Sequence, residues 1–173
     1  MLALARSAIA AALGGEPGPA VPDVPGARLH RGAFVTLEEK GDGALRGCIG
    51  RIAGDRPLGD VVRTVAVSAA VDDPRFPPVT PEELPELRIE ISVLGEPCPF
   101  EPTDPGGLVI GRDGLLVRRG SALGVLLPQV AAEHGLGPET FLAAACRKAG
   151  LGPHAWREPG THVFTFQADV FGE

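Results

Sequence analysis

Hydrophobic and polar positions repeat along the chain with two different periods, and each period predicts its own kind of element. In the segment 58–69, apolar residues recur every three or four positions, which is the spacing of one face of an α-helix. In the segment 87–94 (LRIEISVL), apolar and polar residues alternate, which is typical of a strand with one buried face. The alanine-rich residues 1–14 predict a further amphipathic helix, because their apolar stripe has the helical spacing.

Turn residues divide the other apolar runs into strand pairs. A segment rich in β-branched and aromatic residues, GAFVTLE, is followed by Gly41-Asp42-Gly43 and a second apolar run, which predicts a hairpin. An Asp-Gly pair at 113–114 and a Gly-Ser pair at 120–121 predict a three-stranded meander further along. The strands predicted in this way are 32–38 and 45–52 for the hairpin, and 108–112, 115–119 and 122–127 for the meander.

The order of the predicted elements defines the fold class. Helices over 128–134 and 138–149 and a strand over 163–170 complete the order helix, hairpin, helix, strand, meander, two helices, strand. Because this order lacks regular β-α-β alternation, we expect an α+β fold with a mixed or antiparallel sheet and flanking helices. We expect a single domain over 1–173, with an N-terminal helix over 1–14, a proline- and glycine-rich connector over 15–26 and an α+β body over 27–173.

The overall composition is that of a globular protein without a nucleic-acid partner. Hydrophobic residues make up 44% of the chain and charged residues 22%, which is enough apolar material for a core. The net charge is −6 and the arginines are scattered, which argues against binding to nucleic acid. No apolar run reaches transmembrane length, so we expect no membrane association.

The cysteines predict neither a disulfide framework nor a structural metal site. The chain has 3 cysteines, Cys48, Cys98 and Cys146, which lie far apart and form no Cys-x-x-Cys pair. This usage fits a reducing cytoplasm. The sequence also lacks a Gly-x-Ser-x-Gly motif, a phosphate-binding loop and a dinucleotide fingerprint, so we expect no cofactor.

The strongest candidate for chemistry is Cys48, within the hexapeptide LRGCIG at 45–50. In an extended strand, Arg46 and Cys48 project to the same face, and a guanidinium beside a thiol favours the reactive thiolate. Glycines leave room for a ligand to approach the backbone closely. We therefore predict Cys48 and Arg46 as catalytic residues, and as ligand-binding residues Gly47, Ile49 and Gly50. The alternative is that Cys48 is a small buried hydrophobe.

A second candidate is the proline-rich segment DPRFPP at 73–78. Prolines immobilise their neighbours at low entropic cost, which suits a contact between Arg75 and an anionic or planar ligand. We predict Asp73, Arg75 and Phe76 as ligand-binding residues. The alternative is a helix stop followed by a stiff connector.

Several blocks of the sequence carry a resemblance to a known family. The hexapeptide is one of them, and the others are GAFVTL at 32–37, DPRFPPVTPEEL at 73–84, IEISVL at 89–94, GRDG at 111–114, LLPQVA at 126–131 and CRKAG at 146–150. In these blocks the chain resembles the AMME-syndrome candidate-protein domain, whose bacterial and archaeal members are called AmmeMemoRadiSam system protein A. The matches run over essentially the whole chain.

The resemblance implies an α+β fold with a larger and a smaller lobe, and a hexapeptide near a cleft between them. It also implies two partners from the same system, a Memo-like protein and a radical S-adenosylmethionine enzyme, but no particular reaction. Two hypotheses follow from the residues and the resemblance together. In the first, a cleft around Cys48 binds a small, anionic substrate and uses the thiol. In the second, the protein is a non-enzymatic module that presents a substrate to its partners.

Overall fold

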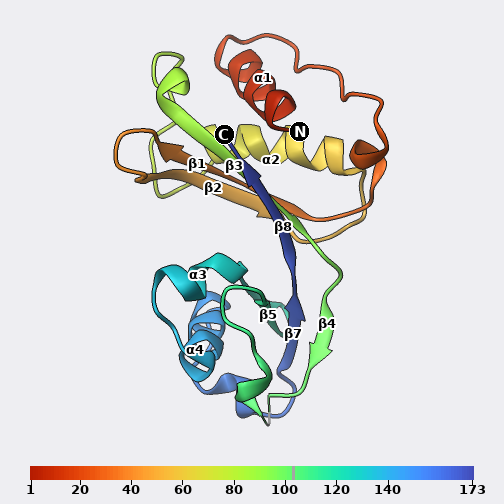
Figure 1. Ribbon diagram of the computed structural model, residues 1–173, viewed down its shortest axis with the longest axis vertical. Helices are drawn as coiled ribbons and strands as arrows, with labels where there is room; N and C mark the ends of the chain where they lie inside the picture. The colour runs from red at the N-terminus through yellow and green to blue at the C-terminus, as the bar shows by residue number, and fades with distance from the viewer. Residues whose placement is uncertain (103) are drawn as a thin grey trace. The chain divides into compact units, whose positions relative to one another are not determined.

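The protein is an α+β structure with two separate sheets. The computed structural model describes residues 1–102 and 104–173, which form two compact units. Unit 1 comprises Met1–Leu94 and Asp169–Glu173, and unit 2 comprises Gly95–Ala168. Each unit has its own sheet (Figure 1). Each also has its own cluster of buried hydrophobic side chains. The predicted fold class is confirmed.

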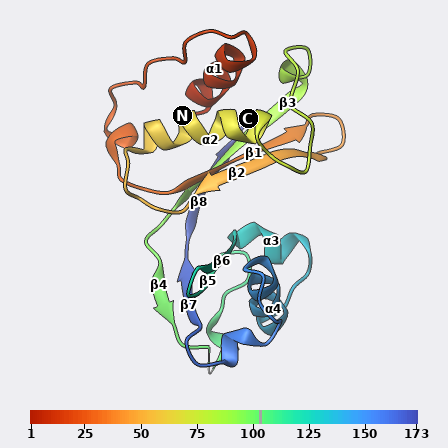
Figure 2. The same cartoon turned by 180° about the vertical axis from the view of Figure 1, so that it is seen from behind.

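Unit 1 is a four-stranded sheet covered on one face by two helices (Figure 1; Figure 2 shows the reverse side). Its strand order is β2-β1-β3-β8, and β1 pairs antiparallel with both β2 and β3. The helices are α1 (Leu2–Leu13) and α2 (Leu58–Val71), and the strands are β1 (Ala33–Glu39), β2 (Leu45–Arg51), β3 (Leu87–Leu94) and β8 (Ala168–Gly172). Short 3-10 helices lie at η1 (Pro25–Arg28) and η2 (Leu84–Glu86).

The alternation of buried positions in β1 explains how the sheet and α2 come together. Ala33, Val35 and Leu37 are fully buried, whereas the residues between them are half-buried on the opposite face. The buried set packs against the apolar stripe of α2, which includes Val62 and Ala66. Full burial of an aliphatic side chain of this size contributes about 1.5–3 kcal/mol, so this layer supplies much of the stability of unit 1.

Unit 2 is a smaller four-stranded sheet in the order β4-β7-β5-β6, with β5 pairing antiparallel to both β6 and β7. Its core contains Phe141, Leu142 and Cys146. The strands are β4 (Cys98–Phe100), β5 (Gly114–Arg119), β6 (Ala122–Leu126) and β7 (His162–Phe166). The helices are α3 (Pro128–Glu133), α4 (Pro138–Lys148), and the 3-10 helices η3 (Pro105–Gly107) and η4 (Ala155–Arg157).

Two of the predicted strands are wrong in detail. The predicted strand 108–112 is a turn, because the Asp113 carboxylate accepts a hydrogen bond from the Val109 N–H at 2.9 Å. The backbone N–H of Asp113 also donates to the Val109 carbonyl, at 3.0 Å. The predicted last strand 163–170 divides into β7 and β8, which belong to different sheets.

No helix among residues 1–102 and 104–173 combines the length and the apolar character that a membrane-crossing helix needs.

Candidate functional site

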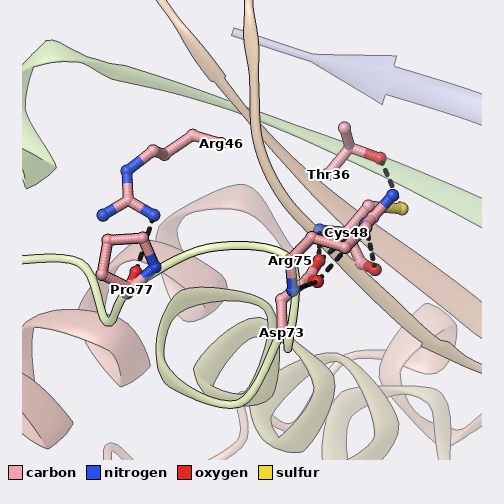
Figure 3. Close-up of polar contacts among 6 residues, drawn as sticks. All are labelled: Thr36, Arg46, Cys48, Asp73, Arg75 and Pro77. Carbon is pink, nitrogen blue, oxygen red and sulfur yellow. Dashed lines mark hydrogen bonds and ion pairs between the residues drawn. The ribbon is translucent and has the colours of Figure 1, made fainter.

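Cys48 lies on β2, at the edge of the first sheet and on the face opposite α2. The strand register places Thr36 of β1 directly beside it, and the Thr36 hydroxyl donates to the Cys48 Sγ at 3.4 Å (Figure 3). The residue is half-buried, so its side chain is not part of the hydrophobic core. Cys48 is thus less buried than the alternative of a small buried hydrophobe expects.

The backbone of Cys48 is held by two side chains from the segment that follows α2. Its N–H donates to the Asp73 Oδ2 at 2.9 Å, and its carbonyl accepts from the Arg75 Nη2 at 3.2 Å (Figure 3). The side chains of Asp73 and Arg75 are themselves joined by two hydrogen bonds, Nε to Oδ1 at 2.9 Å and Nη2 to Oδ2 at 2.6 Å, and the Arg75 amide also donates to Oδ1, at 3.1 Å. The pair satisfies backbone groups that an edge strand otherwise exposes.

The negative charge of Asp73 is stabilised by the Arg75 guanidinium and by nearby amides. The hydrogen bonds from the Arg75 guanidinium hold the pKa of the Asp73 carboxyl far below its usual range, and the amides of Cys48 and Arg75 lower it further. The carboxylate is only 5% exposed, so it depends on these donors. Asp73 is thus an ionised, buried anchor with four hydrogen bonds from its two neighbours.

Arg75 is the cation beside the thiol. Its pKa is raised above the ordinary value, first by the hydrogen bond and charge of Asp73, with a smaller contribution from Cys48. The side chain remains 48% exposed and its guanidinium lies over the Phe76 ring at 5.4 Å. Within residues 1–102 and 104–173, its Nη1 group has no hydrogen-bond partner, so this group can donate to a ligand.

The prediction that Arg46 shares a face with Cys48 is wrong. The pairing of β1 with β2 shifts by one residue here, since Leu37 lies opposite Gly47 whereas Glu38 lies opposite Leu45. Arg46 is therefore the unpaired residue of a β-bulge, a feature that re-aims a side chain. Its guanidinium is directed away from the thiol, toward the segment after α2 (Figure 3).

Arg46 bonds to groups of the segment that follows α2 and not to the thiol. Nη1 donates to the Pro77 carbonyl at 2.9 Å and Nε to the Glu83 Oε1 at 3.1 Å, and the residue is only 7% exposed. The Arg46 hydrogen bond lowers the pKa of the Glu83 carboxyl, helped by the amide of Thr80. The Thr80 amide donates to the Glu83 carboxylate, and the Glu83 amide donates to the Thr80 hydroxyl. This reciprocal pair is a capping box. The bulge thus attaches β2 to the turn before η2.

The glycines of the hexapeptide have packing roles that we did not predict. A Cβ at Gly47 would lie 2.1 Å from the Ala69 carbonyl oxygen, so this glycine lets α2 approach the sheet. A Cβ at Gly50 would lie 2.3 Å from the Phe34 ring, which covers the backbone there. Ile49 packs against the core of unit 1 rather than toward Cys48. Of the residues predicted to bind a ligand, Asp73 and Arg75 bond to the Cys48 backbone, and Phe76 contacts Arg75.

Sequence reasoning missed Thr36 and Phe34, which share the Cys48 face. The signal was present in the predicted hairpin, because a strand register would have placed a residue of 32–38 opposite the thiol. The same register places Glu90 of β3 next to Thr36, and Ser92 next to Phe34. The surface around Cys48 therefore carries polar groups from three strands.

Metal-binding side chains do not cluster in the described residues: no group of three or more His, Cys, Asp or Glu side chains is arranged to hold an ion. His30 lies in unit 1, where it forms a β-bridge with Pro57. The other histidines, His134, His154 and His162, belong to unit 2.

The chain is thus a two-unit α+β protein with a cysteine on the edge strand of its first sheet, whose backbone is held by an Asp–Arg pair. The family model described as AMMECR1 matches residues 2–171, and the chain belongs to that family. The resemblance drawn from the sequence blocks is confirmed.

Relatives with similar sequences occur in archaea. A protein of Methanothermobacter thermautotrophicus is 49% identical over 179 residues, covering 100% of this chain and 92% of the relative. A protein of Thermococcus gammatolerans is 49% identical over 148 residues, covering 82% and 72%. The crystal structure of an uncharacterized protein from Pyrococcus horikoshii superposes with a TM-score of 0.94 at 42% identity, covering 99% of this chain and 89% of that one.

Proposed function

We propose that the surface around Cys48 binds a small anionic substrate and that the Cys48 thiolate takes part in its chemistry. The observation that carries this proposal is the pair of groups beside the sulfur. The Thr36 hydroxyl donates to Sγ at 3.4 Å, and the Arg75 guanidinium, which donates to the Cys48 carbonyl at 3.2 Å, brings a positive charge to the same residue. A hydrogen-bond donor and a cation both stabilise the ionised form, which is the nucleophilic and ligating form of cysteine.

Arg75 takes the role that the sequence suggested for Arg46. Its half-exposed guanidinium keeps the Nη1 group for a substrate oxygen, and a guanidinium suits carboxylate or phosphate oxygens. Phe76 supplies an apolar wall beside it. The Cys48 amide is already bonded to Asp73, so the oxyanion of a substrate relies on Arg75 rather than on that N–H.

In this proposal the protein is component A of a three-part system with a Memo-like protein and a radical S-adenosylmethionine enzyme. Its support is membership of the AMMECR1 family, together with the resemblance to AmmeMemoRadiSam system protein A. Co-purification of the three proteins tests the association directly.

A non-enzymatic role, in which the protein binds and presents a substrate, is favoured by a different observation. Asp73, Arg75 and Gly47 all have structural tasks at the edge of β2, which account for them without catalysis. The two roles differ in one substitution. Replacing Cys48→Ser abolishes turnover by the assembled system if the thiol reacts, and leaves it unchanged if the protein only binds.

Positive charge near the Cys48 thiol is tested with two alkylating reagents of similar size, anionic iodoacetate and neutral iodoacetamide. Cys98 and Cys146 serve as internal references, since Cys98 is exposed, whereas burial raises the pKa of the Cys146 thiol. Mass spectrometry then gives the iodoacetate-to-iodoacetamide rate ratio at each site. We expect a higher ratio at Cys48 than at Cys98.

Matched variants identify the cation. We expect Arg75→Gln to lower the ratio at Cys48 to that of Cys98, and Arg46→Gln to leave it in place, because Arg46 is directed to Pro77 and Glu83. Equal ratios at Cys48 and Cys98 in the wild-type protein would remove the support for an anion site. If Arg46→Gln lowered the rate ratio at Cys48 and Arg75→Gln did not, Arg46 would be the cation that acts on the thiol, as the sequence predicted.

A further inference from the structure

The two edge strands of the first sheet, β2 and β8, differ in how their backbone groups are covered. An edge strand presents unpaired N–H and carbonyl groups, which can pair with another chain. On β2, the Asp73 carboxylate and the Arg75 guanidinium bond to the N–H and the carbonyl of Cys48. Within residues 1–102 and 104–173, no side chain bonds to the backbone of β8 in this way, and most of β8 is exposed.

Two hydrogen bonds show which backbone groups of β8 face away from the sheet. The Gly95 N–H donates to the Gln167 carbonyl at 2.7 Å, and the Glu173 N–H donates to the Ile89 carbonyl at 3.3 Å. β3 and β8 therefore run antiparallel. Because every second residue of a strand faces the same neighbour, the odd-numbered residues of 167–173 face β3. The outward-facing residues are Ala168, Val170 and Gly172. Their N–H and carbonyl groups have no partner in the described part of the chain.

The edge strands of unit 2 carry protective features that β8 lacks. β4 has only 3 residues and includes Pro99, which has no N–H to offer. β6 lies so close beneath α4 that a Cβ at Gly124 would be 2.5 Å from the Ala145 carbonyl oxygen. β8 contains no proline or lysine, and Val170 and Phe171 are 45% and 37% exposed. β8 thus combines free backbone groups with exposed apolar side chains on both faces of the strand.

The sequence of β8 is complementary to itself in one antiparallel register. When the pairing of two copies is centred on Val170, this residue lies opposite its counterpart, and Ala168 lies opposite Gly172 of the second copy. Every outward-facing N–H and carbonyl of both strands is then paired. Asp169 lies opposite Phe171, so no like charges face each other. The β-branched pair at the centre is a favourable cross-strand contact.

The two neighbouring registers are less favourable. A pairing centred on Asp169 puts two carboxylates directly opposite each other, and a pairing centred on Phe171 puts Asp169 opposite Glu173 of the second copy. Like charges in these positions destabilise a strand pair. Each of the two registers also leaves one outward-facing residue of β8 without a partner strand. The register centred on Val170 avoids both costs.

We propose that the partner of β8 is a second copy of this chain, paired antiparallel through β8 with Val170 on the two-fold axis. The two four-stranded sheets then become one continuous sheet, and the same residues form the contact in both copies. A single strand pair buries an area at the low end of protein interfaces, so the dimer is weak. Cys48 lies on β2, at the other edge of the sheet, and the dimer does not depend on its chemistry.

Analytical ultracentrifugation of the full chain from about 5 µM to about 500 µM covers the range of weak dimers. We expect the mean mass to rise from that of one chain toward that of two. Hydrogen exchange followed by NMR at both ends of this range locates the contact. The amides of Ala168, Val170 and Gly172 should become protected only at high concentration, whereas those of Asp169 and Phe171, which face β3, should be protected at both.

Charged substitutions at position 170 test the register. Val170→Lys and Val170→Glu each place like charges opposite each other, so we expect each variant alone to associate at least about tenfold more weakly. A mixture of the two variants places lysine opposite glutamate and should restore the association. Val24→Lys is the matched control, because Val24 is also 45% exposed but lies before η1, outside the sheet. It should leave the association unchanged.

Three results would overturn this dimer, once thermal unfolding has verified that the variants fold. If the protein stays monomeric at about 500 µM, β8 remains open to a strand of a different protein, and the self-pairing is wrong. If Val170→Lys does not weaken the association, the copies meet through another surface. If the mixture of Val170→Lys and Val170→Glu stays monomeric, residue 170 does not lie opposite itself.

Discussion

The position of the Cys48 thiol depends on Asp73, a residue that fixes both the backbone at Cys48 and the guanidinium of Arg75. The carboxylate accepts from the Cys48 amide at 2.9 Å and from two nitrogens of the Arg75 side chain. The buried Asp73 carboxylate therefore fixes both the edge of β2 and the position of the Arg75 guanidinium. A change at Asp73 alters the site without touching the sulfur.

We expect Asp73→Asn to lower the free energy of unfolding by about 2 kcal/mol at neutral pH, because an amide replaces a charged acceptor. The folded-state pKa of Asp73 lies below its ordinary value of 3.8, so its contribution is complete above that value and is lost as pH falls below it. The difference between wild type and variant should therefore shrink in acid. Urea unfolding measured from pH 7 to about pH 3 checks this, and a difference that stays constant with pH would contradict it.

Arg46 and Arg75 differ in burial, and this separates their effects on stability. Arg46 is 7% exposed and supplies the Pro77 carbonyl with a donor, so we expect Arg46→Gln to cost about 2–3 kcal/mol. The side chain of Arg75 is 48% exposed, and we expect Arg75→Gln to cost about 1 kcal/mol. Chemical denaturation of both variants tests the order. A larger loss in Arg75→Gln would show that the edge pair, and not the bulge, secures this region.

At the level of elements, the packing of α2 on β2 depends on a residue without a side chain. Gly47 faces Ala69 so closely that a methyl group would lie 2.1 Å from a backbone oxygen, which cannot rotate away. We expect Gly47→Ala to destabilise the protein by about 3 kcal/mol through separation of the helix from the strand.

Gly41 is the matched control, because an added Cβ there has no atom within 4 Å among the described neighbours. Gly41→Ala should change the free energy of unfolding by no more than about 0.5 kcal/mol. Equal effects at the two glycines in thermal or urea unfolding would mean that the helix adapts to the methyl group.

Hydrophobic periodicity predicted the elements of unit 1 because its elements bury one continuous face. The apolar stripe of 58–69 became α2, and the alternation in 87–94 became β3. Periodicity does not report where two strands slip past each other, and so the bulge at Arg46 was missed. In 108–112 the decisive bond is from an amide to the side chain of Asp113, which outweighs the strand tendency of the apolar residues.

The candidate site was also predictable in part, although from a different signal. The segment 73–78 was identified because its prolines exclude helix, and the structure brings Asp73 and Arg75 to Cys48. Which arginine accompanies the thiol was not predictable, since it depends on the bulge.

In the whole molecule, both ends of the chain belong to unit 1. Strand β8 joins the sheet beside β3, and Glu173 forms ion pairs with Arg6 of α1. Arg6 also donates to the carbonyls of Leu84 and Leu87, at 2.8 and 2.7 Å. The last residues thus connect a helix from the beginning of the chain to the strand that lies near its middle.

We expect deletion of residues 169–173 to loosen unit 1 while the core of unit 2 stays protected. Most of β8 is exposed, so the loss arises mainly from unpaired edge amides of β3 and from the missing partner of Arg6, about 1 kcal/mol in all. Hydrogen exchange measured by mass spectrometry should show faster exchange in β3 and α1, with unchanged exchange in α4, whose contacts lie within unit 2. Glu173→Gln separates the two causes, because it removes the ion pair and keeps the strand. Faster exchange in α4 after the deletion would mean that the two units do not unfold independently.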